Sequence, residues 1–276
     1  MAGTGAREGW YRSTVLLGRG LLRGLGVRVR LSGTEHLPAD GPALLAANHV
    51  SFLDFVFLAH AGIDRGRHVR FLCRHDIWGA PLVGRAMDGM RHVPVDRAAP
   101  AHSYLVARRL LRAGEAVGVF PEAGVSHSFT VRGLMPGAAA LARDTGVPVL
   151  PVALWGGQRI WRAGRAPDGR RIRPELARGR VVDVRIGAPL PVAPDADPVV
   201  TTRRIGEVLT GLLEDVQRLP DHRPRPGEGA PWYPAHLGGD APDRRAALAL
   251  DVLPRSAVAP TWGPSLPPRP ALPEAG

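Results

Sequence analysis

Short apolar runs alternate with longer amphipathic stretches between residues 27 and 219. The short runs are rich in valine, leucine and alanine, as buried strands are, and they predict strands at 27–31, 43–47, 69–73, 92–95, 116–120, 147–155 and 180–187. The amphipathic stretches predict helices at 52–61, 80–90, 101–114, 136–146 and 198–219. Strands that alternate with helices indicate an α/β fold, with helices on the faces of one sheet. Pro148 and Pro151 place their strand at an edge or in an irregular section, because proline donates no ladder hydrogen bond.

The first 26 residues predict a separate amphipathic helix. At about 100° per residue, one side carries Trp10, Leu17, Leu21 and Leu25, and the opposite side carries Arg12, Arg19 and Arg23. Such a helix is typical of a membrane surface. The alternative is a helix that packs on its own domain, and both interpretations stay open here.

The segment after Leu219 differs in composition from the rest of the chain. Residues 220–276 are rich in proline and glycine, and only 243–253 predicts a helix. We expect this extension to be largely disordered after residue 254. The pattern thus divides the chain into a membrane-surface helix (1–26), an α/β domain (27–219) and a C-terminal extension (220–276).

Composition narrows the classes of partner. All of the net charge of +11 comes from arginine, since the chain has no lysine. The charge favours anionic partners such as phosphate or phospholipid headgroups. The arginines are scattered and aromatic residues make up only 5%, so nucleic-acid binding is the weakest interpretation. No apolar run approaches the roughly 18 residues that span a bilayer, so we expect a peripheral protein on the cytoplasmic face of the membrane. The single cysteine, Cys73, rules out an intrachain disulfide and is expected to be a buried thiol.

A polar trio stands at the end of the predicted strand 43–47. Asn48 and His49 follow the strand directly, and Asp54 lies five residues after the histidine. The carboxyl ends of strands are where open α/β sheets bind ligands. From one turn into the next helix, Asp54 could hold one imidazole nitrogen and leave the other free as a base. In the alternative interpretation, Asn48 and Ser51 cap the helix and His49 is incidental.

Two further clusters follow other strands. Glu122 comes after the strand 116–120, and Gly124 would let a substrate approach the backbone. Arg97 closes the strand 92–95 and could bind an anion. Taken singly, Glu122 could be an ion-pair partner and Arg97 a solvated charge. Together, a base, an acid and an arginine indicate activation of a hydroxyl beside an anionic group.

The segments that carry these residues resemble a known family. "NHVSFLD", "RHVPVDR", "FPEAGVS" and "GVPVLPVAL" occur in the order and spacing of the four blocks of the lysophosphatidic acid acyltransferase (PlsC-like, 1-acyl-sn-glycerol-3-phosphate acyltransferase) family. The resemblance covers about residues 25 to 220 and implies a glycerolipid acyltransferase-like α/β sheet flanked by helices. It also implies transfer of a fatty acyl chain from acyl-CoA or an acyl carrier protein to lysophosphatidic acid, which gives phosphatidic acid.

The resemblance implies roles for the site residues. His49 would be the general base and Asp54 its orienting partner, while Arg97 would bind the acceptor phosphate. Glu122 would belong to the acceptor site. The further substrate-binding candidates are Asn48, Gly124, Ser126 and Arg132. No metal or bound cofactor is needed, since a thioester is already activated.

The third block departs from the family pattern, which usually reads Phe-Pro-Glu-Gly-Thr-Arg-Ser. Here Ala123, Gly124 and Val125 stand where that pattern has glycine, threonine and arginine. Arg91, Arg97 or Arg132 could replace the missing arginine. Otherwise the acceptor is another lipid, such as an amino-acid lipid or a glycolipid, or the chain is a non-catalytic lipid-binding module.

Overall fold

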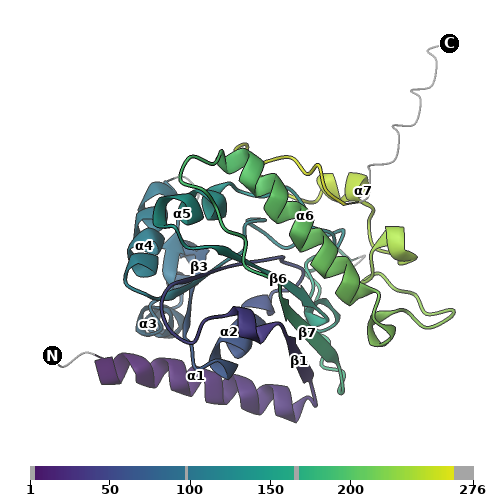
Figure 1. Cartoon of the computed structure of the whole chain (residues 1–276). Coiled ribbons are helices and arrows are strands. Elements are labelled where there is room, and N and C mark those ends of the chain that lie inside the picture. Colours follow the sequence, from purple (N-terminus) through teal and green to yellow (C-terminus); the bar gives the residue numbers. More distant parts are fainter. Residues whose placement is uncertain (1–3, 97–98, 165–167, 264–276) are drawn as a thin grey trace.

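The computed structural model describes residues 4–96, 99–164 and 168–263 (Figure 1). Within them, one sheet has the strand order β1-β7-β6-β2-β5-β3-β4. The strands are β1 (Arg28–Ser32), β2 (Ala43–Ala47), β3 (Val69–Arg74), β4 (Val93–Val95), β5 (Ala116–Val119), β6 (Val149–Trp155) and β7 (Val181–Ile186). The helices are α1 (Thr4–Gly24), α2 (Asp54–Asp64), α3 (Pro81–Gly89), α4 (Ala101–Arg112), α5 (Gly137–Thr145), α6 (Pro198–Gln217) and α7 (Arg244–Leu248). The predicted α/β fold is confirmed.

The sheet is mixed. The strands from β6 to β4 run parallel, whereas β7 is antiparallel to β6 and parallel to β1. Because β2 and β5 are parallel neighbours, the loops that follow them leave the same edge of the sheet side by side. The expected edge position of the proline-containing strand is wrong, since β6 lies between β7 and β2. Pro151 is tolerated there because the pairing with β7 begins only at the next residue, Val152.

Alternating side chains of β2 enter two different layers of the core. Leu44 and Ala46 pack with residues of α4, α5 and α6, whereas Leu45 and Ala47 pack with residues of α2. Consecutive strand residues point to opposite faces, so an all-apolar strand such as β2 must be covered on both sides. Figure 1 shows α4, α5 and α6 over one face and α1 and α2 over the other. Because helices pack on both faces of the sheet, the carboxyl end of β2 is fixed where the polar residues Asn48 and His49 follow it.

The predicted N-terminal helix is present as α1, and it both packs and exposes apolar side chains. Tyr11 is buried, donates its hydroxyl to the Val69 carbonyl and accepts from the Val69 amide. Leu22 packs against the core from the same helix. Leu17 and Leu21, which the sequence places on the lipid side, are exposed, with Leu17 76% accessible. One face of α1 thus packs on its own domain, and another face leaves leucines exposed.

No helix among the described residues is long and apolar enough to cross a membrane.

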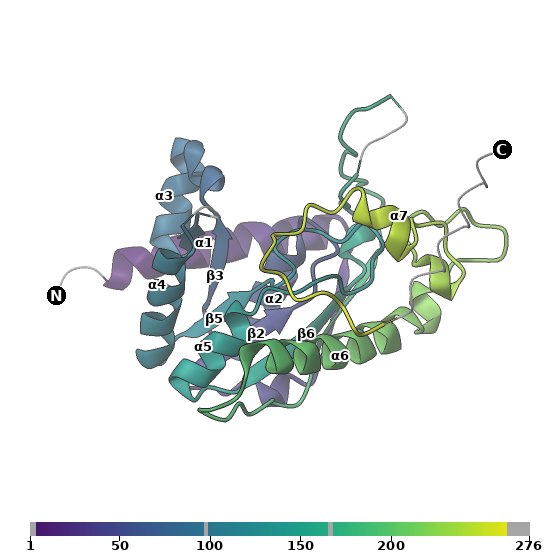
Figure 2. The ribbon, with the colours of Figure 1, turned by 90° about the horizontal axis from the view of Figure 1, so that it is seen from above.

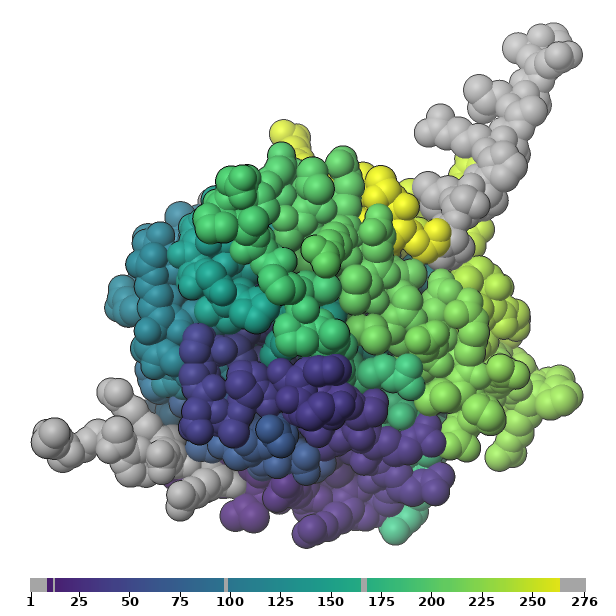
Figure 3. All heavy atoms as spheres, in the orientation of Figure 1, coloured from purple at the N-terminus to yellow at the C-terminus, as the bar shows by residue number. Residues whose placement is uncertain are grey.

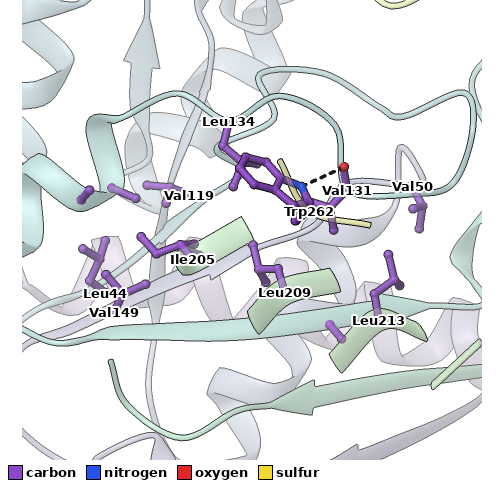
Figure 4. Packing of buried hydrophobic residues seen from close by; sticks show 14 of the residues in the cluster. Leu44, Val50, Val119, Val131, Leu134, Val149, Ile205, Leu209, Leu213 and Trp262 are labelled. Atoms are coloured by element: carbon purple, nitrogen blue, oxygen red, sulfur yellow. Dashed lines mark hydrogen bonds between the residues drawn. The ribbon is translucent and has the colours of Figure 1, made fainter. Parts of the chain in front are cut away.

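The C-terminal extension is more ordered than the sequence suggests. The predicted helix 243–253 is shorter, as α7, and the chain after it continues in a defined path through residue 263. Val258 forms a β-bridge with Leu134, and Trp262 is buried against Gly206 of α6. Figure 4 shows Trp262 among the core side chains, with its indole N–H donated to the Val131 carbonyl at 3.1 Å. A large aromatic side chain thus anchors the part of the extension up to residue 263, while residues 264–276, on which most of the expected disorder falls, lie outside the described residues.

The extension is part of the molecular surface around α6. Figure 3 shows its residues, coloured light green to yellow, as one continuous surface with α6. From above, the yellow segment runs between α6 and α7 (Figure 2). The extension therefore reaches the residues that follow the third block.

Candidate active site

His49 lies in the loop after β2 with its imidazole oriented by a carboxylate. Its Nδ1 is 2.9 Å from Asp54 Oδ2, and 19% of the side chain is exposed. The ring lies against Phe120 at a centroid distance of 4.5 Å, so an apolar wall covers one side. With Nδ1–H donated to the carboxylate, a neutral imidazole carries its lone pair on Nε2. The structure brings together the pair that the sequence predicted.

Asp54 is the first residue of α2, not one turn into it as the sequence suggested. The loop before the helix wraps around its carboxylate, and Oδ2 accepts from the Val50 and Ser51 amides at 2.7 and 2.8 Å. The residue is buried, and its Oδ1 makes no hydrogen bond within the described part of the chain. Burial raises the pKa of Asp54 above its ordinary value, while the bonds from His49, Ser51 and Val50 oppose that shift. Three donors on one oxygen hold the group as a fixed acceptor.

Asn48 occupies a structural position. Its side chain is buried, with Nδ2 donating to the Leu154 carbonyl at 3.0 Å and Oδ1 accepting from the Leu154 amide at 2.7 Å. Both polar groups of the amide are thus used to join the end of β2 to β6. The prediction that Asn48 binds substrate does not fit this placement. Asn48 therefore fixes the backbone directly before His49.

Glu122 braces the His49 loop from the neighbouring strand end. Its buried carboxylate accepts from the His49 amide at 2.6 Å and from the Arg132 amide at 3.1 Å. Burial raises the pKa of Glu122 to about 8, against the opposing effect of Arg132. The sequence brings Glu122 to the right strand end, but the carboxylate faces backbone amides. It fixes the backbone of His49 and does not face solvent.

The remaining third-block candidates also point inward. Arg132 is buried and donates from Nε and Nη2 to the Glu122 carbonyl at 3.1 and 2.8 Å. Gly124 lies against that guanidinium, because a Cβ there would stand 2.4 Å from Nη2. The Ser126 amide donates to the His49 carbonyl at 2.8 Å and its hydroxyl to the Thr130 carbonyl at 2.8 Å. These residues build the frame of the site, and none has a polar side-chain atom turned toward solvent in this arrangement.

The arginines that the sequence offers as phosphate ligands have different surroundings in the structure. Arg97 lies outside the described residues, so its role stays a prediction. Arg91 is paired with Glu115. Val125, at the family's arginine position, is buried.

Two residues near this loop were missed by the sequence reasoning. His127 places Nδ1 2.7 Å from Oδ1 of Asp251, which comes from the C-terminal extension. The two residues are 124 positions apart, so no local spacing could have joined them. The presence of a histidine directly after the third block was the only signal available.

Comparison with known proteins shows which families this chain is similar to. Residues 28–155 match the family model for acyltransferases. The chain is 33% identical over 141 residues to the chloroplastic 1-acyl-sn-glycerol-3-phosphate acyltransferase LPAT1 of Arabidopsis thaliana, covering 50% of this chain and 38% of that protein. It is 27% identical over 215 residues to human 1-acyl-sn-glycerol-3-phosphate acyltransferase alpha, covering 74% of this chain and 71% of that protein. The chain thus spans less than half the length of the plant relative.

The fold has a counterpart among solved structures. The crystal structure of the 1-acyl-sn-glycerophosphate (LPA) acyltransferase PlsC from Thermotoga maritima aligns with a TM-score of 0.60 and 22% identity, covering 77% of this chain and 82% of that chain. At that identity the likeness concerns the fold. Over residues 28–155 the chain is thus similar to acyltransferases, and the relatives it matches include proteins named 1-acyl-sn-glycerol-3-phosphate acyltransferases.

Proposed function

We propose that this protein transfers a fatty acyl group from an acyl thioester to the hydroxyl of 1-acyl-sn-glycerol-3-phosphate and so forms phosphatidic acid. The observation that carries the proposal is the His49–Asp54 pair, with its 2.9 Å contact, at the strand edge where α/β sheets bind ligands. The names of the Arabidopsis and human relatives support the choice of acceptor. Acyl-CoA and acyl carrier protein both supply the required thioester.

The proposed step needs one base. His49 Nε2 takes the proton of the acceptor hydroxyl while the oxygen attacks the thioester carbonyl. The buried Asp54 carboxylate stabilises the imidazolium that forms. Collapse of the tetrahedral intermediate breaks the carbon–sulfur bond, and His49 returns the proton to the leaving thiol. The products are the ester and the free thiol, and no covalent enzyme intermediate is formed.

The test is thiol release from acyl-CoA with and without lysophosphatidic acid. Wild-type protein should release thiol only when the acceptor is present. His49→Ala should lower the rate by about 10² to 10⁴, the usual effect of losing a general base. His102→Ala, an exposed histidine on α4, is the matched control and should keep the wild-type rate. Near-native turnover by His49→Ala, with product identified as phosphatidic acid, would remove the base from the proposal.

A second acceptor class is favoured by one observation. The buried Val125 stands where the family pattern has arginine, so one phosphate contact is missing from the third block. An acceptor without phosphate, such as an amino-acid lipid or a glycolipid, would not need it. Assaying these lipids beside lysophosphatidic acid with one acyl-CoA decides between the two classes, since the true acceptor has the higher kcat/KM.

We further propose that the protein binds a membrane surface peripherally, at the cytoplasmic face. The exposed Leu17 and Leu21 of α1 and the exposed Leu82 of α3 supply apolar contact, and the exposed Arg23 supplies charge toward anionic lipid. The double variant Leu17→Glu/Leu21→Glu should reduce cosedimentation with anionic vesicles without lowering Tm. Leu248→Glu, at an exposed leucine of α7, is the control and should bind as wild type does. Equal binding by all three proteins would exclude α1 as the contact.

A further inference from the structure

The C-terminal extension contributes one carboxylate to the side chains around the third block. Asp251 Oδ1 accepts from His127 Nδ1 at 2.7 Å and lies 3.2 Å from Arg132 Nη1. The side chain of Asp251 is only 3% exposed. A carboxylate this deeply buried needs charged partners, and it has one cation in Arg132 and a second potential cation in His127. The extension therefore holds the His127 ring in one orientation.

His127 stands close to the catalytic loop along the backbone. The residue before it, Ser126, donates its amide to the His49 carbonyl at 2.8 Å. The two histidines also share a geometry, because each has Nδ1 bonded to a buried aspartate and about a fifth of its side chain exposed, 19% for His49 and 20% for His127. In each ring, Nε2 is the nitrogen left for a substrate.

The other polar side chains of this loop are buried. They are Glu122, Ser126, Ser128, Thr130 and Arg132. The Arg132 guanidinium is held between the Glu122 carbonyl and Asp251, so it is turned away from the solvent side. Within the described residues 120–132, the basic side chains are His127 and Arg132, and His127 is the more exposed of the two, at 20% against 7%.

We propose that His127 binds the phosphate of the lysophosphatidic acid acceptor as an imidazolium, which donates Nδ1–H to Asp251 and Nε2–H to the phosphate, and that Asp251 is the positioning residue that orients it. This inference rests on the proposed function, because it names a ligand of that same site. His127 supplies the donor that Val125 cannot. The C-terminal extension thereby completes the acceptor site of a domain whose family match ends at residue 155.

The test compares lysophosphatidic acid with monoacylglycerol, which has the same acyl chain and no phosphate. His127→Asn keeps a donor near the position of Nδ1 for Asp251 and removes Nε2. It should raise KM for lysophosphatidic acid by about tenfold or more, the worth of one charge-assisted hydrogen bond. The kcat and the KM for acyl-CoA should stay close to wild type, so the preference for the phosphate-bearing acceptor falls by the same factor. His127→Gln, whose amide nitrogen lies near the place of Nε2, should recover part of that preference.

Two more variants separate binding from loosening of the extension. Asp251→Asn should raise KM for lysophosphatidic acid, because the ring loses its fixed orientation. Trp262→Phe removes the 3.1 Å bond to Val131 in the same segment and should lower Tm while leaving the acceptor preference unchanged.

Several results would overturn the inference. These are an unchanged acceptor preference in His127→Asn, an equal loss of preference in Trp262→Phe, or a fall in kcat alone. If wild-type protein does not acylate lysophosphatidic acid at all, the proposed function fails and this inference fails with it. If wild-type protein does so and His127→Asn matches it, the inference fails alone.

Discussion

Asp54→Asn should separate the charge of the proposed catalytic pair, His49 and Asp54, from its geometry. In the structure, Oδ2 accepts all three hydrogen bonds, from His49 Nδ1 and from the Val50 and Ser51 amides. Oδ1 is buried and has no partner among the described residues. An asparagine can therefore place its oxygen at Oδ2 and its NH2 at Oδ1 without losing a bond. The tautomer of His49 is preserved, and only the negative charge is removed.

The expected loss follows from Coulomb's law. The imidazolium that forms during acyl transfer has its charge about 4 Å from that of the carboxylate, which is worth about 4 kcal/mol at an effective dielectric constant of about 20. Loss of that stabilisation corresponds to a fall in kcat of about a thousandfold. The free energy of unfolding should not decrease, because burial raises the pKa of Asp54 and the variant no longer buries a charge.

The assay is thiol release at saturating acceptor, with Tm measured on the same samples. Asp64→Asn, an exposed aspartate at the other end of α2, serves as the matched control and should behave as wild type. Retention of more than about a tenth of wild-type kcat by Asp54→Asn would refute the electrostatic role, since that corresponds to less than about 1.4 kcal/mol. A large drop in its Tm would refute the argument from the hydrogen bonds.

Three further changes test the frame of the site. Ala123→Gly should raise Tm by about 2 to 4 °C, because Ala123 has φ 55°, where a Cβ costs about 1 kcal/mol or more; a lower Tm would contradict this. Asn48→Ala should lower the free energy of unfolding in urea by about 2 to 6 kcal/mol, since both Leu154 backbone groups lose their partners, and a loss below about 1 kcal/mol would contradict that role. Burial raises the pKa of Glu122 from 4.5 to about 8, so the folded chain retains a proton that the unfolded chain loses. Wild-type stability should therefore fall as pH rises through that interval, and Glu122→Gln should flatten this dependence; equal pH profiles would contradict it.

The sequence predicted those helices and strands whose hydrophobic residues follow a regular pattern. Each of the seven strands and the larger helices falls at its expected place, because buried parallel strands and amphipathic helices leave strong patterns. The His49–Asp54 pair could also be predicted from the sequence, since the two residues are five positions apart and follow a strand end. The sequence could not show which arginine faces the acceptor. The guanidinium of Arg132 is turned inward by partners that are far away in the chain.

The extension shows the other limit of sequence reasoning. Its proline-rich composition indicates disorder, yet Trp262 is buried against Gly206 of α6. One aromatic side chain can fix a segment whose average composition is that of a loop, and averages over a window do not register it. The same applies to Pro151, which is accepted in the interior of the sheet because of where the β7 pairing begins.

The bond between Trp262 and Val131 joins residues 131 positions apart, which bears on the order of events during synthesis. At about 5 to 20 residues per second, a ribosome needs about ten seconds to make the chain between them. During that time the nascent sheet can pair its first strands, but the loop after the third block has neither Asp251 nor Trp262 to close on. His49 is thus made early and its surroundings are completed late. Emergence of the last aromatic residue, and not of the last strand, marks the point at which the loop after the third block acquires its final packing.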